Sequence, residues 1–131
     1  MTTQHALIVD DDHSIIDVLT MLLAKEGLTY TAVKSLRDVH ALLDGLARVD
    51  VVFLSLEMLN SDSITSLPTL QAHPRMAGVP VVACTARPTE YDAVRRAGFH
   101  SFLVKPIDIQ RFSEQLRLIL SGKPVWDMGE R

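Results

Sequence analysis

Asp50-Val51-Val52-Phe53-Leu54-Ser55-Leu56-Glu57 is the stretch that decides the fold. Its apolar run is too short for a core helix and is rich in β-branched and aromatic residues, which is typical of a parallel strand buried on both faces. Runs of the same kind recur at 6–9, 79–84 and 99–104, with helix-like patterns between them. We therefore expect the strand at 50–57 to lie near the middle of a parallel sheet.

The segments between these runs have the spacing of amphipathic helices. A weaker strand is expected at 28–33, and a loop at 58–63. Pro68 predicts a kink or a late start in the third helix, because proline removes a backbone hydrogen bond and clashes with the preceding turn. Residues 123–131 show no pattern and are interpreted as a tail. The helices are expected at 14–26, 35–46, 64–70, 89–97 and 108–122.

Five strand and helix units with right-handed crossovers predict a doubly wound α/β fold with helices on both faces of the sheet. For five parallel strands the common order is 2-1-3-4-5, the flavodoxin-like (βα)5 arrangement. The domain is expected to span residues 1–122, with 123–131 as a tail or linker. In this order the topological switch point, where the strand order reverses, lies between the first and third strands. A binding site is therefore expected beyond the carboxyl ends of these strands.

The bulk composition narrows the class of protein. The 131 residues are one domain's length, and the net charge of −3 gives no broad basic field. Non-specific nucleic-acid binding by this domain alone is therefore not expected. The single cysteine, Cys84, lies in an apolar strand, which fits a core residue in a reducing compartment. No apolar run approaches the roughly 20 residues of a membrane span. We expect a soluble, cytoplasmic protein that does not bind membranes.

The predicted strands deliver polar residues to one edge of the sheet. Adjacent carboxylates are hard oxygen ligands suited to Mg²⁺, a hydroxyl can hydrogen-bond a phosphoryl oxygen, and a lysine ammonium can neutralise one. Together these groups predict a magnesium and phosphoryl pocket. The residues are Asp10 and Asp11 after the first strand, Ser55 on the third, Thr85 on the fourth and Lys105 on the fifth.

At these positions the chain resembles the receiver domain of two-component response regulators, over residues 5–121. Four stretches carry the resemblance in the family's order: residues 8–12, 50–54, 80–86 and 97–106. The resemblance implies a signalling module in a phosphorelay, not an enzyme. The implied site residues are the Mg²⁺ ligands Asp10 and Asp11, the switch hydroxyl Thr85, the switch aromatic Phe102, and the lysine Lys105 followed by a cis proline at Pro106.

Ser55 departs from this family. The third strand of the family ends in the aspartate that accepts a phosphoryl group from a kinase phosphohistidine, and Ser55 stands at that position. The next loop departs too, because Leu59, Asn60 and Ser63 replace the family's typical proline and glycine. Mg²⁺ is expected to bind more weakly than in a typical receiver. Glu57, about 6–7 Å further along the strand, could reach back as the missing ligand.

No other acceptor is evident nearby. Asp50 is five residues away at the opposite end of the strand, about 16 Å. A serine hydroxyl needs an adjacent base to become nucleophilic, and the only candidate close in sequence is His13, expected to be exposed. The leading hypothesis is a degenerate receiver that acts by protein docking. The alternative is phosphorylation of Ser55 by a serine/threonine kinase, which would place a phosphoserine opposite Lys105. A third hypothesis, a flavin or nucleotide binder, is based on the shared fold alone, and no glycine-rich phosphate loop follows the first predicted strand.

Several of these site residues could instead have purely structural roles. The carboxylates at 10–12 could cap a helix, Lys105 could form a structural ion pair, and Phe102 could be core. Trp126 in the tail could be disordered or could dock on a partner. The resemblance implies a histidine kinase, an output domain or another regulator as partner. It also implies possible homodimerisation through the fourth helix, fifth strand and fifth helix.

Overall fold

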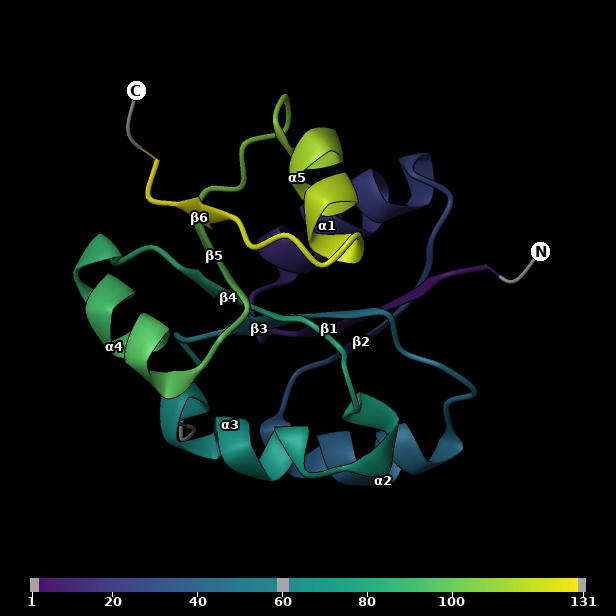
Figure 1. Ribbon diagram of the computed structural model, residues 1–131. Helices are drawn as coiled ribbons and strands as arrows, with labels where there is room; N and C mark the ends of the chain where they lie inside the picture. The colour runs from purple at the N-terminus through teal and green to yellow at the C-terminus, as the bar shows by residue number, and fades with distance from the viewer. Residues whose placement is uncertain (1–2, 59–61, 130–131) are drawn as a thin grey trace.

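The computed structural model describes residues 3–58 and 62–129, so the loop residues Leu59 and Asn60 lie outside the described residues. A parallel sheet in the order β2-β1-β3-β4-β5-β6 forms the centre of the molecule (Figure 1). β3 lies between β1 and β4, as the sequence predicts for this strand. The strands are β1 His5–Val9, β2 Thr29–Val33, β3 Val51–Ser55, β4 Val81–Thr85, β5 Ser101–Val104 and β6 Trp126–Asp127.

The sheet has six strands, and the expectation of five is wrong. The first five strands follow the predicted order, and the sixth comes from the segment interpreted as a tail. β6 pairs in parallel with β5, with Phe102 opposite Trp126 and Leu103 opposite Asp127. Two residues are too few to show a strand's alternation in sequence. The domain boundary at residue 122 stays a prediction.

Helices cover both faces of the sheet (Figure 1). α1 and α5 lie on one face, and α2, α3 and α4 lie on the other. Each face of the sheet is therefore buried, as the apolar strands require. The helices are α1 His13–Lys25, α2 Val39–Gly45, α3 Ser63–Gln71, α4 Tyr91–Ala97 and α5 Phe112–Leu120, with short 3-10 turns at Leu36–Asp38, Pro74–Met76 and Pro88–Glu90.

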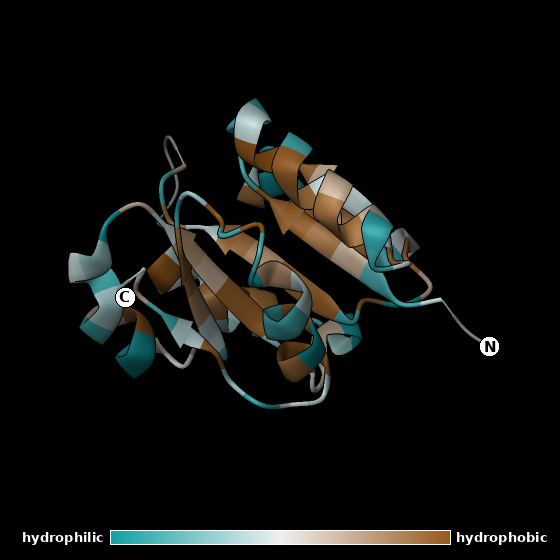
Figure 2. Ribbon diagram, turned by 90° about the horizontal axis from the view of Figure 1, so that it is seen from above, coloured by the Kyte–Doolittle hydropathy of each residue, from teal (hydrophilic) through white to brown (hydrophobic). Residues whose placement is uncertain are grey.

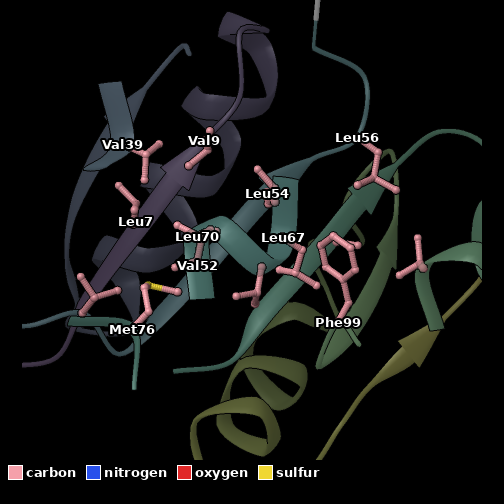
Figure 3. Close-up of a cluster of buried hydrophobic side chains, with 14 of the residues drawn as sticks. Leu7, Val9, Val39, Val52, Leu54, Leu56, Leu67, Leu70, Met76 and Phe99 are labelled. Atoms are coloured by element: carbon pink, nitrogen blue, oxygen red, sulfur yellow. The ribbon is translucent and has the colours of Figure 1, made fainter. Parts of the chain in front are cut away.

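Alternate residues of the central strand enter two separate cores. Val51 and Phe53 pack with α1 and α5, where Phe53 lies 5.9 Å from Phe112 between ring centroids. Val52 and Leu54 face α2 and α3 and pack in the cluster drawn in Figure 3. The strands β1, β3, β4 and β5 are mainly apolar, while the helices alternate between apolar and polar residues (Figure 2). This pattern is what a sheet buried on both faces produces.

Helix starts differ in detail from the sequence predictions. α3 begins at Ser63 and continues through Pro68, so the late start predicted from this proline is not observed. Asp62 fixes this start, because its carboxylate accepts from the backbone N–H groups of Ile64 and Thr65. α5 begins at Phe112 instead of Asp108, since Asp108 caps a preceding turn through the N–H groups of residues 110 and 111.

Asp50 has a structural role at the amino end of β3. Its carboxylate accepts from the backbone N–H of His5 at 2.7 Å and from two nitrogens of Arg48 at 2.9 and 2.6 Å. Burial alone would raise the pKa of the Asp50 carboxyl, but Arg48 and His5 outweigh it and lower the pKa below its ordinary value. The ionised carboxylate therefore ties β1 to β3.

Asp50→Asn is expected to lower the free energy of unfolding by about 1.5–3 kcal/mol at pH 7, the range for hydrogen bonds to charged groups. Because the folded-state pKa is lowered, this stabilisation is present above about pH 3.9 and is lost as the pH falls through the folded-state value. Urea unfolding at pH 7 and pH 3 measures both, with exposed Asp17→Asn as control. An equal loss at the two pH values would contradict the role of the charge.

Candidate functional site

Three strands, β1, β3 and β5, bring side chains to one site at the carboxyl edge of the sheet. The ammonium nitrogen of Lys105, just after β5, lies at its centre. It is 3.2 Å from Asp10 Oδ2, 3.3 Å from Glu57 Oε1 and 3.1 Å from Ser55 Oγ. The structure therefore brings together the side chains of Asp10, Ser55 and Lys105.

Ser55 is buried, with 1% of its surface exposed. Its hydroxyl oxygen accepts from the Lys105 ammonium and, at 3.1 Å, from the backbone N–H of Glu57. Its carbonyl accepts from the buried Ser63 hydroxyl at 2.6 Å. Ser63 thus anchors the start of α3 to the end of β3, a contact that the sequence did not reveal.

Lys105 is held in its charged form. Burial alone would lower the pKa of its ammonium, but the carboxylates of Asp10 and Glu57 outweigh burial and raise the pKa above its ordinary value. Asp10 is 2% exposed, and its other oxygen accepts from the backbone N–H of Asp12 at 3.0 Å. A lysine with a raised pKa cannot serve as a base at neutral pH.

Glu57 reaches back into the site. Its Oε1 accepts from the backbone N–H of Ala86 at 3.1 Å and faces the Lys105 ammonium, while Oε2 lies 3.9 Å from Arg87 Nε. One carboxylate therefore engages a backbone donor from the β4–α4 connection and the cation from β5. The sequence predicted that Glu57 could reach back, but as a metal ligand.

The Thr85 hydroxyl is engaged outside this cluster. It donates to Glu90 Oε1 at 2.9 Å and accepts from the backbone N–H of Arg87 at 3.0 Å. Arg87 Nε in turn lies 3.4 Å from Glu90 Oε1. The backbone carbonyl of Thr85 accepts from the backbone N–H of Lys105 at 2.8 Å. Sequence reasoning missed Glu90 and Arg87, and no motif marks them.

The predicted Mg²⁺ ligands Asp10, Asp11 and Glu57 do not form a ready metal site. Asp11 is partly exposed in the β1–α1 connection. Within residues 3–58 and 62–129, no three His, Cys, Asp or Glu side chains are arranged to hold a metal ion. The candidate base His13 is exposed, and its ring lies 2.7 Å from the Lys34 ammonium, whereas Ser55 Oγ contacts Lys105 and Glu57.

Comparison with known families decides the identity of this domain. Residues 6–117 match the family model described as the response regulator receiver domain. The chain belongs to this family. It is a receiver domain of two-component signalling, and its α/β fold is flavodoxin-like, as the sequence predicted.

Similarity to two response regulators supports the assignment to the receiver family. This receiver is 32% identical over 116 residues to the sensory transduction protein RegX3 of Mycobacterium tuberculosis, covering 87% of this chain and 49% of that protein. It thus spans about half of the length of RegX3. It is 27% identical over 111 residues to the two-component response regulator ORR8 of Oryza sativa, covering 83% of this chain and 92% of that protein.

A solved structure shares the fold. It is the receiver domain of sensor histidine kinase PA1611 from Pseudomonas aeruginosa, solved with a magnesium ion coordinated in its active site cleft. The TM-score is 0.79 at 20% identity, over 92% of this chain and 99% of that chain.

In the present receiver, no helix of the described residues is long and apolar enough to cross a membrane.

Two further positions of the receiver pattern have a defined structure here. Phe102 is fully buried, and its ring packs edge-to-face on Tyr91 with centroids 5.5 Å apart. The bond between Lys105 and Pro106 is cis, as the resemblance implied. Cys84 is buried in β4, and burial raises the pKa of its thiol to about 12, so it is an unreactive core residue.

Proposed function

We propose that this receiver acts in two-component signalling without phosphorylation on aspartate, through docking to a protein partner. The observation that carries the proposal is Ser55 at the carboxyl end of β3, next to Lys105, where the family has its acceptor aspartate. A histidine kinase, an output domain or another regulator is the class of partner. The proposal concerns this domain, and any further domain would add its own function.

The chemistry of Ser55 does not suit phosphoryl transfer from phosphohistidine. A carboxylate is already an anion at pH 7, whereas a serine hydroxyl needs a base to remove its proton. The ionisable group that contacts Ser55 Oγ is the Lys105 ammonium, whose pKa is raised, so it remains protonated. The oxygen accepts from this ammonium and from the backbone N–H of Glu57. These two contacts hold the hydroxyl oxygen as an acceptor, and neither donor can remove its proton.

Glu57 supplies the negative charge that a phosphoryl group would otherwise bring. Its Oε1 contacts both the Lys105 ammonium and the Ala86 N–H, a cation and a backbone donor at the mouth of the site. Cations and backbone N–H groups are the partners that bind phosphoryl oxygens. We infer that Glu57 is a built-in anion that fixes this end of the receiver in one arrangement, with the Thr85 hydroxyl held by Glu90 and the Phe102 ring buried.

We further infer that Mg²⁺ binds weakly. PA1611 was solved with a magnesium ion in its active site cleft, and the carboxylates of Asp10 and Asp11 are the Mg²⁺ ligands that the receiver resemblance implies here. In this chain, however, the Lys105 ammonium lies against both Asp10 and Glu57, so a metal would compete with a cation already present. Mg²⁺ requires near-octahedral oxygen ligands and gives up its water reluctantly. If bound, it would neutralise charge at phosphoryl oxygens.

The alternative of Ser55 modification by a serine/threonine kinase has no support in the geometry. Ser55 is 1% exposed, and a kinase would need its hydroxyl in an accessible segment. Phosphopeptide mapping of the protein from its native cells tests this alternative directly. A phosphoserine at Ser55 would replace the proposed function with that of a long-lived phosphoryl latch.

Ser55→Asp is expected to gain one phosphoryl group when incubated with Mg²⁺ and a small-molecule phosphodonor, while the wild type gains none. The substitution adds both the nucleophile and a third carboxylate beside Asp10 and Asp11. Intact mass spectrometry reads the adduct, and hydroxylamine identifies it, because acyl phosphates are cleaved and serine esters are not.

Ser55→Asn is the matched control, since asparagine has the shape of aspartate without its charge and should gain nothing. A stable adduct on the wild type would overturn the proposal. If neither the wild type nor Ser55→Asp gains a phosphoryl group, the pocket itself has changed beyond position 55, and docking without phosphorylation is the favoured function. Adding Glu57→Gln to Ser55→Asp should increase the yield, because it removes the carboxylate charge that engages Lys105.

A further inference from the structure

The last described residues, 123–129, lie along the outer edge of β5 (Figure 1). The Phe102 N–H donates to the Val125 carbonyl at 2.8 Å, and the Val125 N–H donates to Ser101 Oγ at 3.0 Å. Without this segment, β5 would present unpaired backbone groups at the end of the sheet. Such an edge is a template for pairing with another chain.

Trp126 attaches this segment to α4. Its ring is 5.5 Å from the Tyr91 ring and 6.5 Å from the Phe102 ring between centroids, and the Arg95 guanidinium lies 4.8 Å above it. The segment therefore covers Phe102 and packs on the exposed face of α4. Aromatic pairs and cation–π contacts of this kind stabilise partly exposed surfaces.

Asp127 attaches the same segment to α5. Its Oδ2 accepts from Gln115 Nε2 at 2.7 Å and lies 3.2 Å from an Arg111 nitrogen, and its Oδ1 accepts from the Gly129 N–H at 2.8 Å. This carboxylate is 9% exposed. Together with Trp126, it spans β5 and both flanking helices, the same three elements through which homodimerisation was expected.

We propose that residues 123–129 form an intramolecular strap that blocks the edge of β5 and keeps the receiver monomeric. Opening of the strap exposes an edge that pairs with the same edge of a second copy. Two identical strand edges related by a two-fold axis match each other in antiparallel pairing. Only two residues of the strap are paired in the sheet, so it can open without unfolding the core. This device is independent of what happens at Ser55.

Asp127→Ala tests the proposal, because it removes the contacts to α5 and leaves Trp126 in place. Hydrogen exchange of the Phe102 amide reports the strap directly, since that N–H donates to Val125. We expect its exchange to become about tenfold faster, the factor for losing a charge-assisted hydrogen bond. The Val52 amide, bonded to Pro80 inside the sheet, should not change. Light scattering after size-exclusion chromatography should show dimer increasing with concentration in the variant only.

Glu114→Ala is the charge-matched control, because Glu114 is exposed on α5 and its ion pair is with Arg117 of the same helix. Gly129→Ala is a second variant that leaves the charge unchanged: its φ is +80°, and an added Cβ would lie 2.8 Å from Val104 Cγ1. Gly27→Ala controls for backbone strain, since Gly27 has φ +83° and open space around it.

Two results would overturn the strap. One is an unprotected Phe102 amide in the wild type, which would mean that the segment is not bound. The other is fast Phe102 exchange in Asp127→Ala or Gly129→Ala with a monomeric mass at every concentration, which would mean that the strap blocks no self-association. If Asp127→Ala does not fold, Gly129→Ala provides the same two readings.

Discussion

Lys105→Met should lower the free energy of unfolding by about 3–5 kcal/mol, the cost of leaving a buried charge without its partner. The ammonium lies against Asp10, which is 2% exposed, and it also contacts Glu57 and Ser55. Methionine keeps most of the side-chain length and apolar volume, so the loss reports the charge and not a cavity. Urea unfolding followed by circular dichroism at pH 7 measures it.

The same variant should respond to Mg²⁺. Without the ammonium, Asp10 and Glu57 lack their shared cation, and a divalent ion that binds the folded state should recover part of the lost stability. The wild type should change little over the same Mg²⁺ range. Lys25→Met, an exposed lysine at the end of α1, is the control and should lose less than about 0.5 kcal/mol. A loss of that size in Lys105→Met would show that its ion pairs are solvated and weak.

The order of the first five strands and the two helical faces follow from the sequence because each strand is an apolar run with a clear boundary. β3 shows this best, since Val51 and Phe53 enter one core while Val52 and Leu54 enter the other. β6 could not be found in this way. Its two residues become a strand only because Trp126 meets Tyr91 and the edge of β5, which are distant in the sequence.

The candidate site was predictable as far as strand ends determine position. Ser55 and Lys105 are 50 residues apart, yet Ser55 ends β3 and Lys105 follows β5, and the carboxyl ends of parallel strands meet at one edge. The direction of each side chain was not predictable. Thr85 comes to the expected edge, but its hydroxyl turns to Glu90, because the 3-10 turn Pro88–Glu90 brings that carboxylate within 2.9 Å. Such a contact depends on the path of a loop, and no periodicity encodes it.

Phe102→Ala is expected to lower the free energy of unfolding by about 3–5 kcal/mol, the range for removing a buried aromatic ring. The Phe102 ring is fully buried, packs on Tyr91 and lies under Trp126. Tyr30→Ala is the matched control, because Tyr30 is an aromatic residue on the edge strand β2 with 44% of its surface exposed. It should lose less than about 1 kcal/mol.

The size of this loss distinguishes two roles for Phe102. A switch aromatic that spends much of its time rotated toward solvent would contribute little to the core, and its truncation would cost about as much as that of Tyr30. A ring fixed under Trp126 can leave its pocket only when the strap opens, so truncation should cost the full value. A loss near that of Tyr30→Ala, measured by urea unfolding, would show that the buried position is one of several. A loss of about 3–5 kcal/mol would show that the ring stays in its buried position, packed against Tyr91 and Trp126.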